Sequence, residues 1–386
     1  MHGEGLAGRV PKGDRRARLL QVLTINAMPV RLKDIARDLG VSVVTVSKVL
    51  RNHNDISEDT RDRVLKRTKE LNYHPNLTAR ALVTGRSHLI GLIVPDLVHA
   101  FFAEVAKGVS GVLRAKGYGL VIASSEEDPD LEKQEIAQML ARRMDALIIA
   151  STQKTLESFR RIKEQNTPYI LVDRKLRGLE AHFIGTDDVV VGALATEHLI
   201  DIGCRRIAFI GGRHASTAVD RLEGYRNTLA EHSLPVSKDY VVSLAHADNA
   251  GDATGYEAMK DLLRRKPRPD GVFCVNDPVA IGAMKAILEA GLDIPGDIAV
   301  VGAGNVRYAS DLRVPLTTVD QQSEQLGQRA AKLALNLIQL KKNIKSEHIL
   351  LEPKLLTRES SARAGRPSRS NRRVRNGKMR PIANDI

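Results

Sequence analysis

The chain has 386 residues, of which 42% are hydrophobic, 27% are charged and 3% are aromatic. This length predicts two or three domains, and the apolar fraction excludes wholesale disorder. The sequence lacks both the long apolar run of a membrane-spanning helix and the pattern of a secretion signal. Its two cysteines, Cys204 and Cys274, lie far apart, so neither a disulfide framework nor a thiolate zinc site is indicated. We therefore expect a cytoplasmic protein that holds no metal.

The net charge of +13 is concentrated at the two ends of the chain. Residues 1–88 carry a net charge of +8 and residues 361–386 a net charge of +7, which leaves −2 for residues 89–360. Basic ends on a near-neutral body indicate a polyanionic partner, above all nucleic acid. Charge alone leaves a second interpretation open, in which the ends confer solubility or form a disordered tail.

Residues 1–29 show no clear hydrophobic period, and we expect a disordered extension there. Residues 30–75 predict three short helices, because apolar residues recur at helical spacing. Gly40 marks the end of the first helix, and Ser42 and Ser57 are placed to cap the second and third. The predicted inner faces consist of Leu32, Ile35, Ala36, Leu39, Val46, Val49, Leu50, Val64, Leu65 and Leu71. This spacing is typical of a helix-turn-helix, although a purely structural helical hairpin has the same pattern.

Residues 76–87 contain a short fourth helical segment, which ends at Gly85. Isolated helices of fewer than ~12 residues are marginally stable, so this segment should need a partner to form. A helix that forms only with a partner would serve as a switch.

Residues 88–360 predict short apolar strands that alternate with amphipathic helices. The strands are expected at 89–94, 120–123, 146–150, 169–172, 207–210, 272–275, 298–301 and 349–351. The helices are expected at 102–116, 131–142, 189–202, 218–231, 255–265, 280–290 and 321–340. This alternation indicates an α/β fold with doubly wound parallel sheets, and its length favours two lobes. Residues 361–386 are basic and poor in apolar residues, which predicts a disordered tail.

Several motifs resemble those of LacI/GalR-type repressors, in the same order along residues 30 to about 360. The DNA-binding part matches at Asp34-Ile-Ala, Thr45-Val-Ser-Lys-Val-Leu and Leu71-Asn-Tyr-His-Pro-Asn, and the body matches at Val172-Asp-Arg, Arg221-Leu-Glu-Gly-Tyr, Val275-Asn-Asp and Asp297-Ile-Ala-Val-Val-Gly. The resemblance implies a helix-turn-helix headpiece, a hinge helix and a two-lobed periplasmic-binding-protein-like body. It also implies a homodimer on double-stranded operator DNA, controlled by a small molecule.

By this resemblance, Val43 and Val44 begin the recognition helix at the positions that choose bases. Valine can pack on a thymine methyl group, and Lys48 one turn later can donate to guanine or to a phosphate. Thr45 and Ser47 are expected to contact phosphates. The alternative is that the two valines are exposed without reading any base.

The hinge helix supplies three further expected DNA contacts, Asn76, Ala79 and Leu82. Asn76 would contact a phosphate, and Leu82 matches the leucine that wedges between the central base pairs and bends the duplex. The alternative is that Leu82 only packs the linker against the body.

The effector is expected between the lobes, at loops that follow strands. The residues expected to contact it are Phe101, Phe102, Ser151, Asp173, Arg221, Asn276, Asp277 and Asn305. Phe102 matches an aromatic residue that stacks on ligands, although one of the two phenylalanines belongs to the core. Arg221 matches an arginine that pairs with hydroxyl or carboxylate groups. The ligand is expected to be a sugar or a related metabolite. One departure is Gly304, at a position where many family members have an aspartate that grips sugar hydroxyls. Its loss argues against an ordinary polyhydroxylated sugar and leaves a different sugar, a phosphate or acid, or no ligand as alternatives.

Other functional classes fit the sequence less well. No dinucleotide-binding, P-loop, serine-nucleophile or zinc-protease motif is present, so we expect neither an enzyme nor a cofactor. A transport-type binding protein would need a signal peptide and would not need residues 30–87. A nonspecific DNA binder would show neither a specific site nor an effector response. We therefore predict a DNA-binding transcriptional regulator, most simply a repressor, with no membrane partner.

Overall fold

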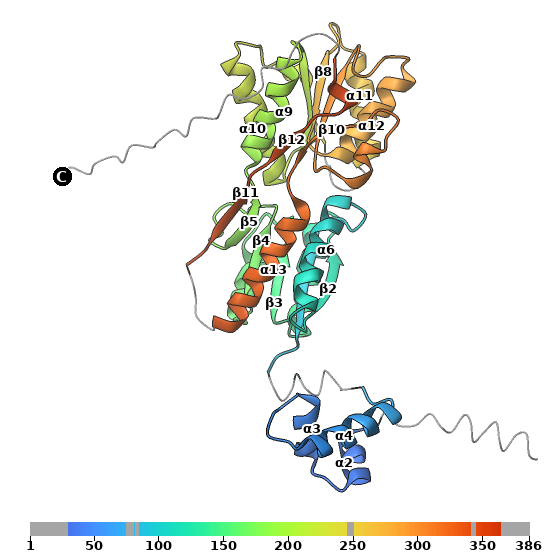
Figure 1. Ribbon diagram of the computed structural model, residues 1–386. Coiled ribbons are helices and arrows are strands. Elements are labelled where there is room, and N and C mark those ends of the chain that lie inside the picture. The colour runs from blue at the N-terminus through green and yellow to red at the C-terminus, as the bar shows by residue number, and fades with distance from the viewer. Residues whose placement is uncertain (1–29, 75–80, 82–84, 245–250, 341–344, 364–386) are drawn as a thin grey trace, which may run out of the picture. The chain divides into compact units, whose positions relative to one another are not determined.

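Figure 1 shows a computed structural model of the chain, which describes residues 30–74, 81, 85–244, 251–340 and 345–363. The chain divides into two compact units, Met1–Gly85 and Arg86–Ile386. A search of the described residues finds no helix that is long and apolar enough to cross a membrane.

The described part of the first unit contains three helices, α2 (Leu32–Leu39), α3 (Val43–Leu50) and α4 (Glu58–Glu70). Gly40 ends α2 with a left-handed φ of 66°, and the Ser42 hydroxyl caps α3 by accepting from the Thr45 amide at 3.0 Å. The fully buried core comprises Ile35, Ala36, Val46, Val49 and Val64. The prediction of Leu65 as an inner residue is wrong, because Val64 occupies the inner face of α4 and its neighbour is turned away, 46% exposed.

The second unit is built on two six-stranded sheets. The first sheet has the order β11-β5-β4-β3-β1-β2 and is parallel throughout. Its strands are β1 (Leu89–Val94), β2 (Gly119–Ser124), β3 (Ala146–Ile149), β4 (Tyr169–Val172), β5 (His182–Thr186) and β11 (His348–Leu351). The second sheet has the order β12-β10-β9-β8-β6-β7, in which only β12 is antiparallel to its neighbour. Its strands are β6 (Ile207–Gly212), β7 (Val241–Leu244), β8 (Gly271–Cys274), β9 (Ala299–Ala303), β10 (Thr317–Asp320) and β12 (Lys354–Leu356).

Helices cover the faces of both sheets, as the strand–helix alternation predicts (Figure 1). The first sheet carries α6 (Ala100–Arg114), α7 (Pro129–Ala141), α8 (Glu157–Glu164) and α13 (Ser323–Leu340), and the second carries α9 (Asp188–Asp201), α10 (Ser216–Glu231), α11 (Gly251–Leu263) and α12 (Asp277–Glu289). We call the first sheet with its helices lobe 1, and the second sheet with its helices lobe 2. The chain passes between the lobes after β5, after β10 and after β11.

Helices α6 and α13 lie in close contact because each supplies a glycine to the other. A side chain at Gly108 would come within 2.1 Å of the Glu324 carbonyl, and one at Gly327 would come equally close to that of Val105. The C-terminal helix α13 is thereby fixed on lobe 1, far in sequence from the helix that it contacts.

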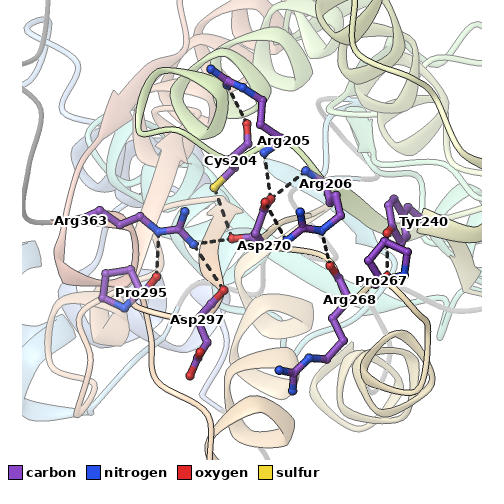
Figure 2. Close-up of polar contacts among 10 residues, drawn as sticks. All are labelled: Cys204, Arg205, Arg206, Tyr240, Pro267, Arg268, Asp270, Pro295, Asp297 and Arg363. Atoms are coloured by element: carbon purple, nitrogen blue, oxygen red, sulfur yellow. Dashed lines mark hydrogen bonds and ion pairs between the residues drawn. The ribbon is translucent and has the colours of Figure 1, made fainter.

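The last described residues belong to lobe 2. Ser361 is buried, and the Arg363 side chain donates to the carbonyl oxygens of Pro295 at 3.0 Å and Asp270 at 2.7 Å (Figure 2). Residues 361–363, which the sequence assigned to the tail, therefore form part of the lobe. Residues 364–386 and the predicted extension 1–29 lie outside the described residues.

Candidate nucleic-acid interface and effector site

The start of α3 presents two apolar side chains to solvent. Val43 is 45% exposed and Val44 is 62% exposed, whereas Val46 and Val49 on the opposite face are buried in the core. The Ser42 cap fixes where the helix begins, and the Thr45 hydroxyl lies 2.8 Å from that of Ser42. The core therefore uses one face of α3 and leaves its N-terminal valine pair available to a partner.

Lys48 lies one turn further along α3, where its ammonium group donates to the Asp55 carboxylate. This hydrogen bond is the main reason that the pKa of Asp55 lies below its ordinary value. Ser47 is half-buried, and its carbonyl oxygen accepts from Arg51 at 3.2 Å. The remaining predicted DNA contacts, Asn76, Ala79 and Leu82, lie outside the described residues.

The carboxyl ends of the two sheets face each other. The amide of Lys175, just after β4 of lobe 1, donates to the hydroxyl of Ser216, just after β6 of lobe 2, at 2.8 Å. The predicted effector residues that follow strands are Ser151 after β3, Asp173 after β4, Asn276 and Asp277 after β8, and Asn305 after β9. Because parallel strands of one sheet end at one edge, the fold gathers these residues where the lobes meet.

In lobe 1, the Ser151 hydroxyl donates to the Glu132 carboxylate at 2.7 Å. Glu132 is fully buried and also accepts from the Thr152 hydroxyl at 2.7 Å, and burial raises the pKa of its carboxyl. Sequence reasoning missed Glu132, since an acid on an amphipathic helix gives no sign that it points inward. Asp173 is buried and adopts a left-handed φ of 62°.

Phe101 and Phe102 are both core residues. They are 4% and 2% exposed and lie in the core of lobe 1. Their rings pack edge to face, with 5.1 Å between the ring centroids. One of the two was expected in the core, and the structure places both there. Stacking of Phe102 on a ligand stays a prediction.

In lobe 2, Arg221 forms a buried ion pair with Asp188. Its Nε and Nη2 atoms both lie 2.8 Å from Asp188 Oδ1, and Nη1 donates to the Val275 carbonyl. The arginine thus joins α10 to the start of α9 and the end of β8. Its partner Asp188 was not predicted, because an aspartate in the first turn of a helix gives no sign that it points inward.

Asp277 has protein partners at both carboxylate oxygens. Oδ1 accepts from the Thr318 hydroxyl at 2.6 Å, and Oδ2 accepts from the Val306 amide at 2.8 Å. Asp277 is fully buried, and burial raises the pKa of its carboxyl to about 6. Its neighbour Asn276 caps α12 by accepting from the Val279 amide at 3.0 Å. Asp277 therefore supports the loop that follows β9, and Asn276 supports the start of α12.

That loop contains Gly304 and Asn305. Gly304 has a φ of +129°, and a Cβ there would lie 3.5 Å from Asp277 Oδ2. The Asn305 side chain accepts from Arg358 at 2.8 Å. Where many family members have an aspartate, this chain therefore has Gly304, which lies beside the buried acid Asp277. The next residue, Asn305, has an amide that is already bonded to Arg358.

Two surface cavities, of about 330 and 480 Å³, lie elsewhere in this unit. The smaller is lined by α10 and the end of β6, and the larger by α6, the start of α13 and residues 307–308. None of the eight predicted effector residues lines either of them. Ser151, Arg221, Asp277 and Asn305 bond instead to protein groups. Among the described residues, no cluster of three or more acidic, histidine or cysteine side chains is arranged to hold a metal.

Comparisons with known proteins extend these observations. Residues 31–76 match the profile of bacterial regulatory proteins of the lacI family, and residues 196–361 match that of a periplasmic binding protein-like domain. The chain is 36% identical over 307 residues to the HTH-type transcriptional regulator GalR of Escherichia coli (strain K12), covering 79% of this chain and 88% of that protein. It is 34% identical to the HTH-type transcriptional repressor PurR of Proteus mirabilis (strain HI4320), covering 86% and 96%.

Solved structures give the same result. The lac repressor dimer bound to operator and the anti-inducer ONPF has a TM-score of 0.77 at 27% identity, covering 86% of this chain and 99% of that one. The complex of the transcriptional regulator CelR with cellobiose has a TM-score of 0.65 at 27% identity, with the same coverage. The chain therefore belongs to the LacI family of bacterial transcriptional regulators, which are DNA-binding proteins and not enzymes.

Proposed function

We propose that this protein is a cytoplasmic repressor that binds a pseudo-palindromic DNA operator as a homodimer and is controlled by a small molecule between its lobes. The observation that carries the DNA-binding part is the exposed pair Val43 and Val44 at the capped start of α3. A solvent-facing apolar pair has no role in the core of this unit, whereas the methyl group of thymine in the major groove is a suitable partner. The operator-bound lac repressor dimer supports the same assembly.

The effector is proposed to be a sugar or a related metabolite. Relatives of this fold have been solved with cellobiose and with ribose. In this chain Arg221, Asn276 and Asn305 supply the polar groups of the site, while the glycine at 304 removes one carboxylate acceptor. A ligand with fewer hydroxyl groups at that end, or one that carries an acid, would fit this set of groups better than a fully hydroxylated sugar.

Control would follow from a difference in effector affinity between two arrangements of the lobes. A coupling free energy of about 1–3 kcal/mol between effector and operator would shift operator occupancy several-fold or more. In this proposal the hinge segment forms its helix on DNA, and Leu82 opens the central base step. Leu82→Ala should then keep nonspecific binding and lose DNA bending, and unchanged bending in a FRET assay would exclude the wedge.

The first test is selection of bound duplexes from a random pool at about 150 mM salt, near physiological ionic strength. The expected result is a palindromic motif with a fixed central step. Val44→Asn should change the preferred base at one position in each half-site. Val219→Asn, at an exposed valine of lobe 2, is the matched control and should leave the motif unchanged.

A motif that appears only when a metabolite mixture is added would identify the effector as a corepressor. A motif that is lost on that addition would identify an inducer. The absence of any motif with and without metabolites would contradict the proposal and favour a nonspecific DNA binder.

A further inference from the structure

The recognition helix α3 carries one charged side chain, Lys48, and that charge is already compensated. Its ammonium group donates to the carboxylate of Asp55, in the loop between α3 and α4. Both side chains are partly exposed, 36% and 54%, so the pair lies at the surface. The lowered pKa of Asp55, caused chiefly by this hydrogen bond, keeps the carboxylate ionised at neutral pH.

The loop that carries Asp55 is held in place from α4. Arg61 donates from Nη1 to the Asn52 side chain at 2.6 Å and from Nη2 to the His53 carbonyl. The His53 amide in turn donates to the Lys48 carbonyl at 3.1 Å. Because these bonds fix the loop against the end of α3, the position of Asp55 relative to Lys48 is set by the fold.

The structure pairs Lys48 with a carboxylate, whereas it shows the other cation of this segment on a neutral acceptor. Residues 43–56 contain two basic side chains other than histidine, Lys48 and Arg51, and Arg51 donates to the Ser47 carbonyl at 3.2 Å. An unpaired lysine on a recognition helix would attract the phosphates of any sequence, which strengthens nonspecific binding. A lysine held by a carboxylate gains less from a phosphate, because it must give up its partner.

We infer that Asp55 is a specificity-determining residue that acts through Lys48. Its negative charge repels phosphates near the lysine, whereas a neutral base edge is not repelled, so Lys48 can still donate to acceptors such as the O6 and N7 atoms of guanine. This inference rests on the proposed function, in which α3 reads the operator. It makes Asp55 a positioning residue, which lowers affinity for random DNA more than affinity for the operator.

The test compares Asp55→Asn with wild type on the selected operator and on a random-sequence duplex, between 50 and 200 mM salt. The variant should bind random DNA several-fold more tightly at low salt, through one additional phosphate contact. Each phosphate contact steepens the fall of log affinity with log salt concentration by about 0.9. The advantage of the variant on random DNA should therefore shrink about threefold between 50 and 200 mM salt. Operator affinity should rise less, so the ratio of operator to random-DNA affinity should fall.

Asp59→Asn is the matched control, because it removes the same charge from the same unit. Asp59 is 82% exposed and lies near Arg63 on α4. Asp59→Asn should change DNA affinity less than Asp55→Asn does, and by the same factor on the operator and on the random duplex. In a Lys48→Met background, Asp55→Asn should change binding no more than Asp59→Asn does. Thermal unfolding of each variant checks that the headpiece is intact.

Three results would overturn the inference. Equal effects of the Asp55 and Asp59 substitutions would show a general charge effect, and so would an Asp55 effect that persists without Lys48. An equal change on operator and random DNA would show that Asp55 has no role in specificity. Failure of wild type to select any motif would instead count against the proposed function, which keeps the two failures distinguishable.

Discussion

The guanidinium group of Arg363 donates to the carbonyl oxygen of Asp270 at 2.7 Å and connects the end of the described chain to lobe 2. Asp270 is itself a centre of contacts, since its side chain accepts from the amides of Arg205 and Arg206 at 3.0 and 2.8 Å (Figure 2). Arg363 also donates to Pro295, which lies in the connection before β9. The last described residue is therefore joined to the amino-terminal end of the second sheet.

Arg363→Ala should destabilise lobe 2, because it leaves the carbonyls of Asp270 and Pro295 without this donor. The expected cost is about 1–3 kcal/mol, the range for losing hydrogen bonds from a charged donor. Calorimetric unfolding of the full chain measures it. Arg264→Ala, at a side chain that is 74% exposed, is the control and should have little effect. Equal melting of the two variants would contradict the structural role of Arg363.

Truncation can separate the tail from the lobe. Residues 364–386 contain seven Lys or Arg and one Asp, and we expect them to add nonspecific DNA affinity. A chain that ends at Arg363 should melt like wild type and show a shallower salt dependence of DNA binding. A chain that ends at Ser360 should be less stable as well. An unchanged salt slope after the first truncation would refute the DNA-binding role of the tail.

The Arg221–Asp188 pair should be costly to break from one side. Arg221→Met leaves a buried carboxylate without its cation, which costs about 3–5 kcal/mol in comparable sites. Adding Asp188→Leu should recover part of that loss, because the unpaired charge is removed as well. Denaturant unfolding of wild type, both single variants and the double variant completes the cycle. Additive losses would mean that the two side chains do not depend on each other.

Asp277 should make stability depend on pH in a particular direction. Its carboxyl has a pKa of about 6 in the folded protein and an ordinary value of 3.8. Since the folded state holds this proton more tightly, the contribution of Asp277 is fully present below about pH 4 and is lost as the pH rises through about 6. The melting temperature of wild type relative to Asp277→Asn should therefore fall between pH 4 and 6 and level off above. A relative rise over that range would contradict the assignment.

Gly304→Asp restores the residue that many family members have, yet we expect it to destabilise this protein. The φ of +129° disfavours any side chain, and a Cβ would lie 3.5 Å from the Asp277 carboxylate. Gly304→Ala introduces the same backbone strain without the charge. The difference in melting temperature between the two variants thus measures the carboxylate repulsion, and equal melting would exclude it.

The sequence predicted the fold well where strands are continuously apolar, as in β1, β3 and β4. It missed β10, because Thr317 and Thr318 are polar residues in a buried strand and use their hydroxyl groups to bond Ser361 and Asp277. It missed α8, which has few apolar residues to mark a helical face. Strands β5, β7 and β12 were also not predicted.

The candidate site was predicted less completely than the fold. The motifs pointed to Arg221 and Asp277, but not to Asp188, Glu132 or Thr318, which hold such side chains. Those partners lie 19 to 41 residues away in the chain. Only the three-dimensional packing of helices on sheet ends brings them together, so no local spacing could reveal them.

The three passages of the chain between the lobes affect the order in which the protein is made. Lobe 1 needs helix α13 and strand β11, which the ribosome supplies only after all of lobe 2 except β12 and the last residues. During synthesis, the first sheet therefore lacks β11 at its β5 edge and helix α13 on its face until lobe 2 has largely been made. The body becomes complete only after β12 and Arg363 have been made, whereas helices α2, α3 and α4 are made before either lobe.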